Sequence, residues 1–192
     1  MLTSGSKVIC WVPTWSRPFK RVGLEHVVLT ATRADSVLLA IDEDGTAFRL
    51  TYQLKWDRTF AVRRADLEVT KGRTRRTLSL RSDGRGTWFD ARGARVPRLA
   101  GCIDIDIWPT PLTNSVPIWR SRLRVGQRRE FRMAWIAAPA LTVQPVDQAY
   151  TKLAKGRYLF ESLDGSGFRA TLDVDRHGLV TRYPGLFERV GA

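Results

Sequence analysis

Apolar and polar residues alternate in short runs along most of the chain. In the run 47–56 every second residue is aromatic or leucine, and most of the residues between them are polar. Successive side chains of a strand point to opposite faces, so this period of two is typical of a strand with one buried face. Similar runs predict strands at residues 8–12, 24–32, 37–41, 60–69, 74–81, 87–89, 102–108, 120–126, 130–137, 141–150, 156–163, 168–174 and 179–183. Helical spacing is nearly absent, with a weak indication at 149–154.

Turn residues separate these runs at close intervals. The segment Asp-Glu-Asp-Gly at 42–45 and the glycines Gly72, Gly165 and Gly178 suit the backbone conformations of tight turns. Strands joined by tight turns pair antiparallel, and a sheet with this many strands has to curl or close. No change in composition marks a boundary. We therefore expect a single domain of residues 1–192 that is mainly β, with one long, strongly curved antiparallel sheet (an incomplete barrel) and little helix.

The middle of the chain carries the sharpest pattern, Cys-Ile-Asp-Ile-Asp-Ile-Trp at 102–108. On a strand its three isoleucines share one face, whereas Asp104, Asp106 and Trp108 share the other. The next segment, Pro109–Pro117, is rich in proline and polar residues. Because proline removes the N–H donors of a sheet, this segment is predicted to be a stiff polar loop rather than a central strand.

The chain is strongly basic, with a formal net charge of +13. Such a charge suits anionic ligands, acidic membrane surfaces or nucleic acid, and an arginine-rich composition can equally reflect the genome. Apart from a local cluster of Arg73, Arg75 and Arg76, the basic residues are scattered. No nucleic-acid recognition motif accompanies them. The expectation is weak, salt-sensitive, non-specific binding of anions or nucleic acid.

Several kinds of site and location find no support in the sequence. No metal site is expected, because Cys10 and Cys102 are far apart and His26 and His177 do not cluster with them. No cofactor is expected either. There is no basic and then apolar leader and no run of about 18 apolar residues, so we expect no signal peptide, no membrane span and a cytoplasmic location. Nothing in the sequence specifies an oligomeric state.

Longer motifs resemble the putative glycolipid-binding family, a bacterial group formerly known as a domain of unknown function. The main one is Gly-Cys-x-Asp-x-Asp followed by Thr-Pro-x-Thr-Asn-x-x-Pro-Ile, at 101–118. Further matches are Gln-Ala-Tyr-Thr at 148–151, the segment 174–187, Trp11 and the segment 23–25. Trp56 and Phe60 stand near Asp57, where the family usually shows a cysteine before the aspartate and a tryptophan after it, and this puts any role of those positions in doubt. The resemblance implies a spiral β-roll, similar to bacterial lipoprotein carriers, and a glycolipid ligand.

The candidate site centres on the aspartates of the middle strand. Asp104 and Asp106 are close enough to raise one another's pKa, and such a pair can hydrogen-bond sugar hydroxyls or transfer a proton. They can equally be an exposed strand face, or carboxylates paired with arginines. The indole of Trp108, on the same face, can cover the apolar face of a pyranose.

Other polar residues extend this candidate site. Thr113 and Asn114 lie in the predicted loop, where they either bind a ligand or cap turns. Gln148 and Tyr150 share a strand face and either line the same hollow or are buried. Glu25 either adds to the acidic cluster or pairs with an arginine. The predicted ligand-binding residues are Asp104, Asp106, Trp108, Thr113, Asn114, Arg120, Gln148 and Tyr150, and none is assigned a catalytic role.

Two functions remain open from the sequence. The first is binding of an amphipathic ligand, a glycolipid or lipid, in the concave cavity of the curved sheet. The second is a hydrolase or isomerase that uses Asp104 and Asp106 as acid and base on a sugar-like or lipid-like substrate.

Overall fold

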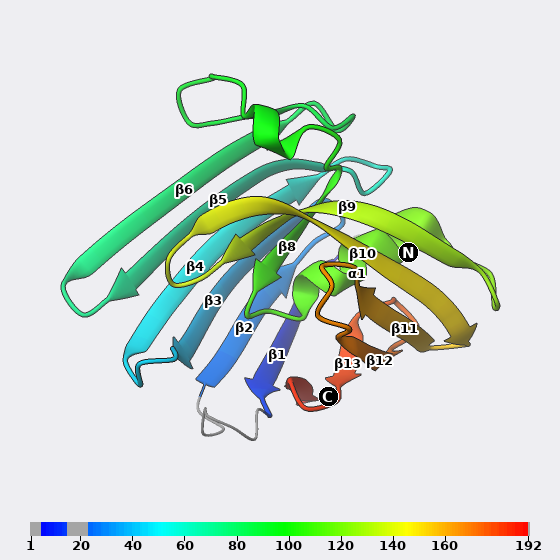
Figure 1. The fold of residues 1–192 in the computed structure, drawn as a ribbon. Helices are drawn as coiled ribbons and strands as arrows, with labels where there is room; N and C mark the ends of the chain where they lie inside the picture. Colours follow the sequence, from blue (N-terminus) through cyan, green and yellow to red (C-terminus); the bar gives the residue numbers. More distant parts are fainter. Residues whose placement is uncertain (1–4, 15–22, 192) are drawn as a thin grey trace.

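A computed structural model describes residues 5–14 and 23–191 of the chain, and every strand in these ranges belongs to one sheet (Figure 1). The strands are β1 (Lys7–Pro13), β2 (Gly23–Leu29), β3 (Arg33–Ile41), β4 (Ala47–Trp56), β5 (Val62–Lys71), β6 (Thr74–Ser82), β7 (Trp88–Phe89), β8 (Asp104–Trp108), β9 (Arg128–Ala137), β10 (Thr142–Ala154), β11 (Arg157–Ser162), β12 (Arg169–Val174), β13 (Val180–Tyr183) and β14 (Phe187–Val190). A 3-10 helix, η1 (Pro97–Leu99), and one α-helix, α1 (Leu112–Ser121), complete the described elements. The predicted mainly β fold with one curved, unclosed sheet is confirmed.

The order of strands in the sheet is β7-β6-β5-β4-β3-β2-β1-β14-β13-β12-β11-β10-β9-β8. Strands β1 and β14, from opposite ends of the chain, pair antiparallel with Cys10 opposite Val190. The remaining neighbours are also antiparallel except β8 and β9, which run parallel with Asp106 opposite Trp135. The sheet therefore runs as two successions of neighbouring strands, β7 to β1 and β14 to β8, that meet where the two ends of the chain pair.

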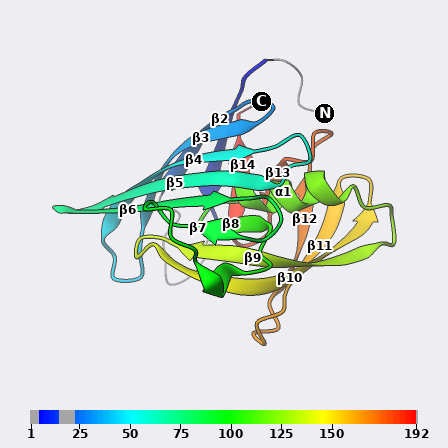
Figure 2. The ribbon, with the colours of Figure 1, turned by 90° about the horizontal axis from the view of Figure 1, so that it is seen from above.

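The end of the sheet that contains β8 is rolled into the curve of the N-terminal strands. Figures 1 and 2 show β9 and β10 as a second layer across β3–β6, with α1 between the layers. Ile105 and Ile107 are completely buried in the core that the inner faces of β1–β6 provide. On the opposite face of β8, Asp104, Asp106 and Trp108 lie toward the curve made by β9–β14. Both faces of this strand are therefore covered, which makes the sheet a spiral roll.

Two apolar cores follow from this spiral. The larger lies between β1–β6 and the outer faces of β8 and β9, and includes Trp11, Leu50, Trp56 and Ile136. The smaller lies within the curve of β9–β14 and is rich in aromatic residues, namely Phe131, Tyr150, Tyr158, Phe160, Tyr183 and Phe187. Helix α1 contributes to both cores, so it joins the two halves of the roll.

The segment after β8 corrects the sequence prediction. A loop at 109–117 and a strand at 120–126 were expected, but residues 112–121 form α1 with Pro117 inside it. Leu112, Val116 and Trp119 recur at the spacing of one helical face, and all three pack in the larger core. Burial of this face outweighs the cost of a proline in the helix. Residues 149–154, weakly indicated as helical, belong to strand β10.

The far end of α1 is held by the turn before β13. The indole Nε1 of Trp119 donates a hydrogen bond to the carbonyl oxygen of His177 at 2.7 Å. Gly178 follows with φ of +77°, and a Cβ at this position would lie 2.9 Å from the Trp119 ring. The backbone can approach the ring this closely because residue 178 is glycine.

Neither helix in the described ranges is long and apolar enough to cross a bilayer. Cys10 and Cys102 are both free thiols. Cys102 is buried, as expected, whereas Cys10 is partly exposed. The predicted absence of a leader peptide concerns residues that include 1–4, which lie outside the described ranges.

Candidate functional site

Strand β8 and helix α1 are joined by two matched polar contacts. The guanidinium of Arg120 binds the carboxylate of Asp104, with Nε 2.9 Å from Oδ1. About two helical turns earlier in α1, the hydroxyl of Thr113 donates to Oδ1 of Asp106 at 2.9 Å and accepts the backbone N–H of Ile107 at 3.1 Å. Two aspartates at strand spacing thus meet two helix residues seven positions apart. This geometry fixes the side chain of Asp106.

The second oxygen of Asp106 is held from strand β10. The amide Nε2 of Gln148 donates to Oδ2 of Asp106 at 2.6 Å. Because the amide nitrogen faces the carboxylate, the amide oxygen of Gln148 points elsewhere. That oxygen is buried and has no hydrogen-bond partner within the described part of the chain. Buried polar groups nearly always have a partner, so this unpaired oxygen, like the hydroxyl of Ser115, stands out among the buried side chains of the described ranges.

Asp106 and Gln148 lie in the wall of a cavity of about 340 Å³ inside the curve of β8–β13. Its remaining walls are mainly aromatic, with polar side chains from β10, β11 and the following loop. They consist of Trp108, Trp135, Gln144, Val146, Phe160, Ser162, Asp164, Ser166, Phe168, Tyr183 and Leu186. A few fixed polar groups among large apolar surfaces are the usual composition of a small-molecule site.

The other predicted residues lie beneath or beside this cavity rather than in its wall. Asp104 is fully buried in its contact with Arg120, whose guanidinium also lies 5.4 Å from the ring centroid of Phe131. Nδ2 of Asn114 donates to the hydroxyl of Tyr150 at 2.9 Å, and both side chains are buried. Of the eight residues, Asp106, Trp108 and Gln148 line the cavity. The rest support the strand and helix that carry them.

Sequence reasoning missed much of the cavity wall. The wall residues Trp135, Phe160, Asp164, Phe168 and Tyr183 were not among the predicted ligand-binding residues. Trp135 stands opposite Asp106 in the sheet, and both residues face the side on which Gln148 lies. That relation depends on the parallel pairing of β8 with β9, which the sequence alone does not specify.

Burial governs the titration of the site. Removal from water raises the pKa of Asp106, and the hydrogen bonds from Gln148 and Thr113 oppose this shift. Burial also raises the pKa of Asp104, against the effect of Arg120. Neither aspartate perturbs the other, which corrects the expectation that the pair would raise each other's pKa. The pKa of Tyr183 is raised by burial and by the nearby charge of Asp106.

A third buried carboxylate lies on the other half of the roll. Glu25 accepts hydrogen bonds from the hydroxyls of Ser36 at 2.7 Å, Tyr52 at 2.6 Å and Thr110 at 2.7 Å. Burial raises its pKa, and these three hydroxyls oppose the shift. Glu25 therefore belongs neither to the acidic cluster nor to an ion pair with arginine, the two alternatives left open by the sequence.

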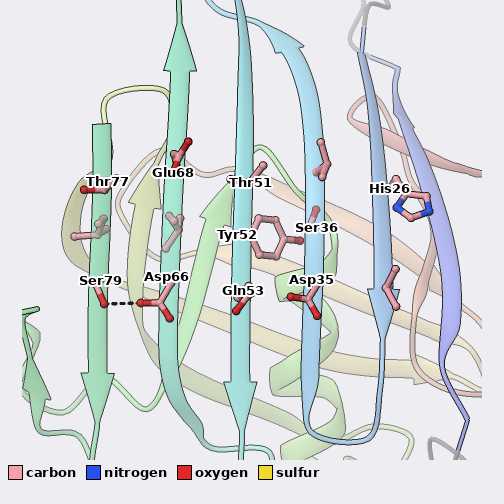
Figure 3. A pocket seen from close by; sticks show the side chains of 14 residues that line it. His26, Asp35, Ser36, Thr51, Tyr52, Gln53, Asp66, Glu68, Thr77 and Ser79 are labelled. Atoms are coloured by element: carbon pink, nitrogen blue, oxygen red, sulfur yellow. Dashed lines mark hydrogen bonds between the residues drawn. The ribbon is translucent and has the colours of Figure 1, made fainter. Parts of the chain in front are cut away.

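The outer face of β2–β6 carries a wider hollow of about 540 Å³ (Figure 3). Asp35, Gln53, Asp66 and Ser79 form a row across four strands, and Ser79 donates to Asp66. Arginine side chains pair with its acidic residues Asp35, Asp66 and Glu68. No buried polar group is left without a partner among the residues of this hollow that the structure describes. The cavity at Asp106 is therefore the stronger candidate for a ligand site.

Within residues 5–14 and 23–191, no three His, Cys, Asp or Glu side chains are placed to hold a metal ion.

Comparison with known proteins gives one family and one solved structure. The family described as "Putative glycolipid-binding" matches residues 12–189. The crystal structure of a DUF1089 family protein from Pseudomonas aeruginosa is 44% identical in sequence and superposes with a TM-score of 0.87, covering 92% of this chain and 98% of that one. No curated protein matches.

Proposed function

The chain belongs to the putative glycolipid-binding family, and from this premise we propose that the cavity at Asp106 binds the sugar head of an amphipathic ligand. The observation that carries the proposal is the Asp106 carboxylate, held by the amide of Gln148, in a cavity wall that also contains two indoles. A pyranose offers hydroxyl donors around its edge and an apolar face. The hydroxyls suit Gln148 and Asp106, and the apolar face suits Trp108 or Trp135.

The apolar part of the ligand finds its contacts in the same cavity. Val146, Phe160, Phe168 and Leu186 surround the polar groups. Phe168 is among the large apolar residues exposed to solvent, so an acyl chain that leaves the cavity past this residue would cover surface that is otherwise in water. Each buried CH₂ contributes about 0.8 kcal/mol.

An acid–base enzyme is less well supported by the geometry. A hydrolase or isomerase of the kind considered from the sequence needs both Asp104 and Asp106 at one substrate. Asp104 is buried against Arg120 and does not reach the cavity wall. The arrangement therefore favours binding without turnover.

Two further expectations belong to this proposal. The free thiols of Cys10 and Cys102 fit a reducing compartment such as the cytoplasm. Weak, salt-dependent association with nucleic acid or other anions follows from the net charge of +13 and is independent of the cavity.

Titration calorimetry with alkyl β-glucosides of six to ten carbons tests the proposal. The dissociation constant is expected to fall about fourfold per added methylene while the chain is still being buried. Trp108→Ala and Gln148→Leu should weaken binding at least tenfold. The matched control is Gln53→Ala in the outer hollow, which should bind as the parent does. Loss of binding in Gln53→Ala but not in Trp108→Ala would place the ligand elsewhere.

A further inference from the structure

The cavity wall has the opposite charge to the protein as a whole. The chain contains 32 lysines and arginines against 19 aspartates and glutamates. The charged residues of the wall are nevertheless Asp106 and Asp164, and no lysine, arginine or histidine is among its described lining residues. A ligand in the cavity therefore faces two carboxyl groups and no cationic side chain among the described lining residues.

Neither carboxylate is neutralised by a cation of the chain. Asp106 is bonded by Thr113 and Gln148, which are uncharged. The carboxylate of Asp164 accepts the backbone N–H of Ser166 at 2.9 Å. Across the described ranges, no ion pair within 4.0 Å involves either aspartate. Asp104 and the acidic residues of the outer hollow, by contrast, all pair with arginine.

A neighbouring hollow of about 500 Å³ is also lined by acidic residues. It shares Trp108 and Trp135 with the first cavity, and its charged lining residues are Asp42, Glu43 and Asp44. Lys71 contacts Asp42 and Asp44 from outside the lining. The two indoles thus stand between two acidic hollows.

The uncharged groups of the wall favour the same kind of ligand. The two carboxyl groups of the wall, on Asp106 and Asp164, offer acceptor oxygens, which suit a ligand rich in hydrogen-bond donors. The faces of aromatic rings attract cations and repel anions. Trp108, Trp135, Phe160 and Tyr183 present such rings.

We propose that the cavity selects amphiphiles whose sugar head is rich in donors and not anionic, with an amino sugar preferred over a neutral sugar and a uronic acid excluded. This inference rests on the proposed function and names the class of head group. It opposes the expectation drawn from net charge alone, under which anionic ligands are the natural partners of the protein.

Three octyl glycosides with one chain length and different head charges provide the test. They are octyl β-glucosaminide, octyl β-glucoside and octyl β-glucuronide, titrated calorimetrically into the full chain at about 0.15 M salt. The glucosaminide is expected to bind about threefold to tenfold more tightly than the glucoside. The glucuronide should bind at least tenfold more weakly than the glucoside.

Variants that each remove one negative charge locate the effect. Asp106→Asn and Asp164→Asn should each reduce the ratio of glucosaminide to glucuronide affinity at least threefold. Glu188→Gln on the exposed side of β14 removes the same charge without touching the cavity and should leave the ratio unchanged. Asp164 lies on an exposed loop, so its variant keeps the test open if Asp106→Asn fails to fold.

The outcomes separate this inference from the proposed function. Binding of all three glycosides with equal affinity, or with the glucuronide tightest, overturns the charge preference and leaves a sugar-binding cavity. Binding of none of the three overturns the proposed function and the preference with it.

Discussion

The two halves of the roll each bury a carboxylate, and the two carboxylates differ in how completely they are satisfied. Glu25 and Asp106 are both bonded by a threonine whose hydroxyl also accepts a backbone N–H, Thr110 from Leu112 and Thr113 from Ile107. Burial raises the pKa of both. Glu25 is enclosed by three hydroxyls, however, and is not among the lining residues of the Asp106 cavity or of the outer hollow.

The Asp106 cluster is incomplete by comparison. Its partner Gln148 keeps an unpaired oxygen, and both residues line a cavity with aromatic walls. A raised pKa alone therefore does not distinguish a structural carboxylate from a binding one. The useful criteria are whether the hydrogen bonds close within the chain and whether a ligand can reach the group.

Replacement of each of the two residues by alanine should give the largest difference in stability between the two clusters. Glu25→Ala leaves the hydroxyls of Ser36, Tyr52 and Thr110 buried without their acceptor. This change should lower the free energy of unfolding by roughly 3–5 kcal/mol. Asp106→Ala should cost only about 1–2 kcal/mol, because Asp106 lines the cavity and water from the cavity can fill the space that its carboxylate leaves. Urea denaturation followed by tryptophan fluorescence measures both. Equal losses would contradict the distinction between a closed and an open cluster.

The two threonines offer a matched pair of smaller changes. Thr110→Val and Thr113→Val each remove a donor to a carboxylate and the acceptor of a backbone N–H, so each should lower the unfolding free energy by about 1–3 kcal/mol. Their effects on ligand should differ. Thr113→Val frees the side chain of Asp106 and should lower the affinity for octyl glucoside severalfold. Thr110→Val should leave this affinity unchanged. An effect of Thr110→Val on affinity would mean that the two clusters are coupled.

The dependence of stability on pH should separate Glu25 from its amide variant. Because the pKa of Glu25 is raised in the folded chain above its usual 4.5, the unfolded chain releases this proton first. The contribution of Glu25 is therefore most favourable below about pH 4.5 and declines as pH rises through the folded pKa. Glu25→Gln lacks this decline, so its stability relative to the parent should improve between pH 4 and pH 8. A constant difference across that range would show that burial does not shift this pKa.

The outer hollow should show the smallest effect of all. Glu68 lies on this face and pairs with Arg75 at 2.6 Å in contact with solvent. Such pairs add little to stability because water and salt screen them. Glu68→Gln should leave the melting temperature and the affinity for octyl glucoside within experimental error of the parent. A loss of affinity would move the ligand site to the outer face.

Much of the fold follows from local pattern, because strand period and turn chemistry are set by neighbouring residues. The run 47–56 became β4, and Asp42–Gly45 became the turn before it. Helix α1 escaped prediction because Pro117 and the polar residues around it outweighed the helical spacing of Leu112, Val116 and Trp119. Its stability comes from burial between two layers, which no local pattern records.

The candidate site was predicted in part for the same reason. The alternation at 102–108 predicted that Asp106 and Trp108 share one strand face. The run at 141–150 likewise placed Gln148 and Tyr150 on one face of another strand. The meeting of β8 with β10–β13 depends on contacts between residues far apart in sequence. For this reason Asp104 and Asp106, equivalent in the sequence, have different surroundings in the fold: one pairs with Arg120, and the other lines the cavity.

The terminal strands of the sheet have a consequence for self-association. An open sheet normally exposes a row of unpaired backbone groups at each edge, to which strands of other molecules can add. Here β7 offers only two residues, and β8 is wrapped inside the roll, where the N–H of Ile107 bonds to Thr113 instead of to another strand. At the β8 end the molecule thereby limits edge-to-edge polymerisation without closing its strands into a ring. At the other end, β7 pairs only with Arg81 and Ser82, so the rest of β6 is the edge to which a foreign strand can add.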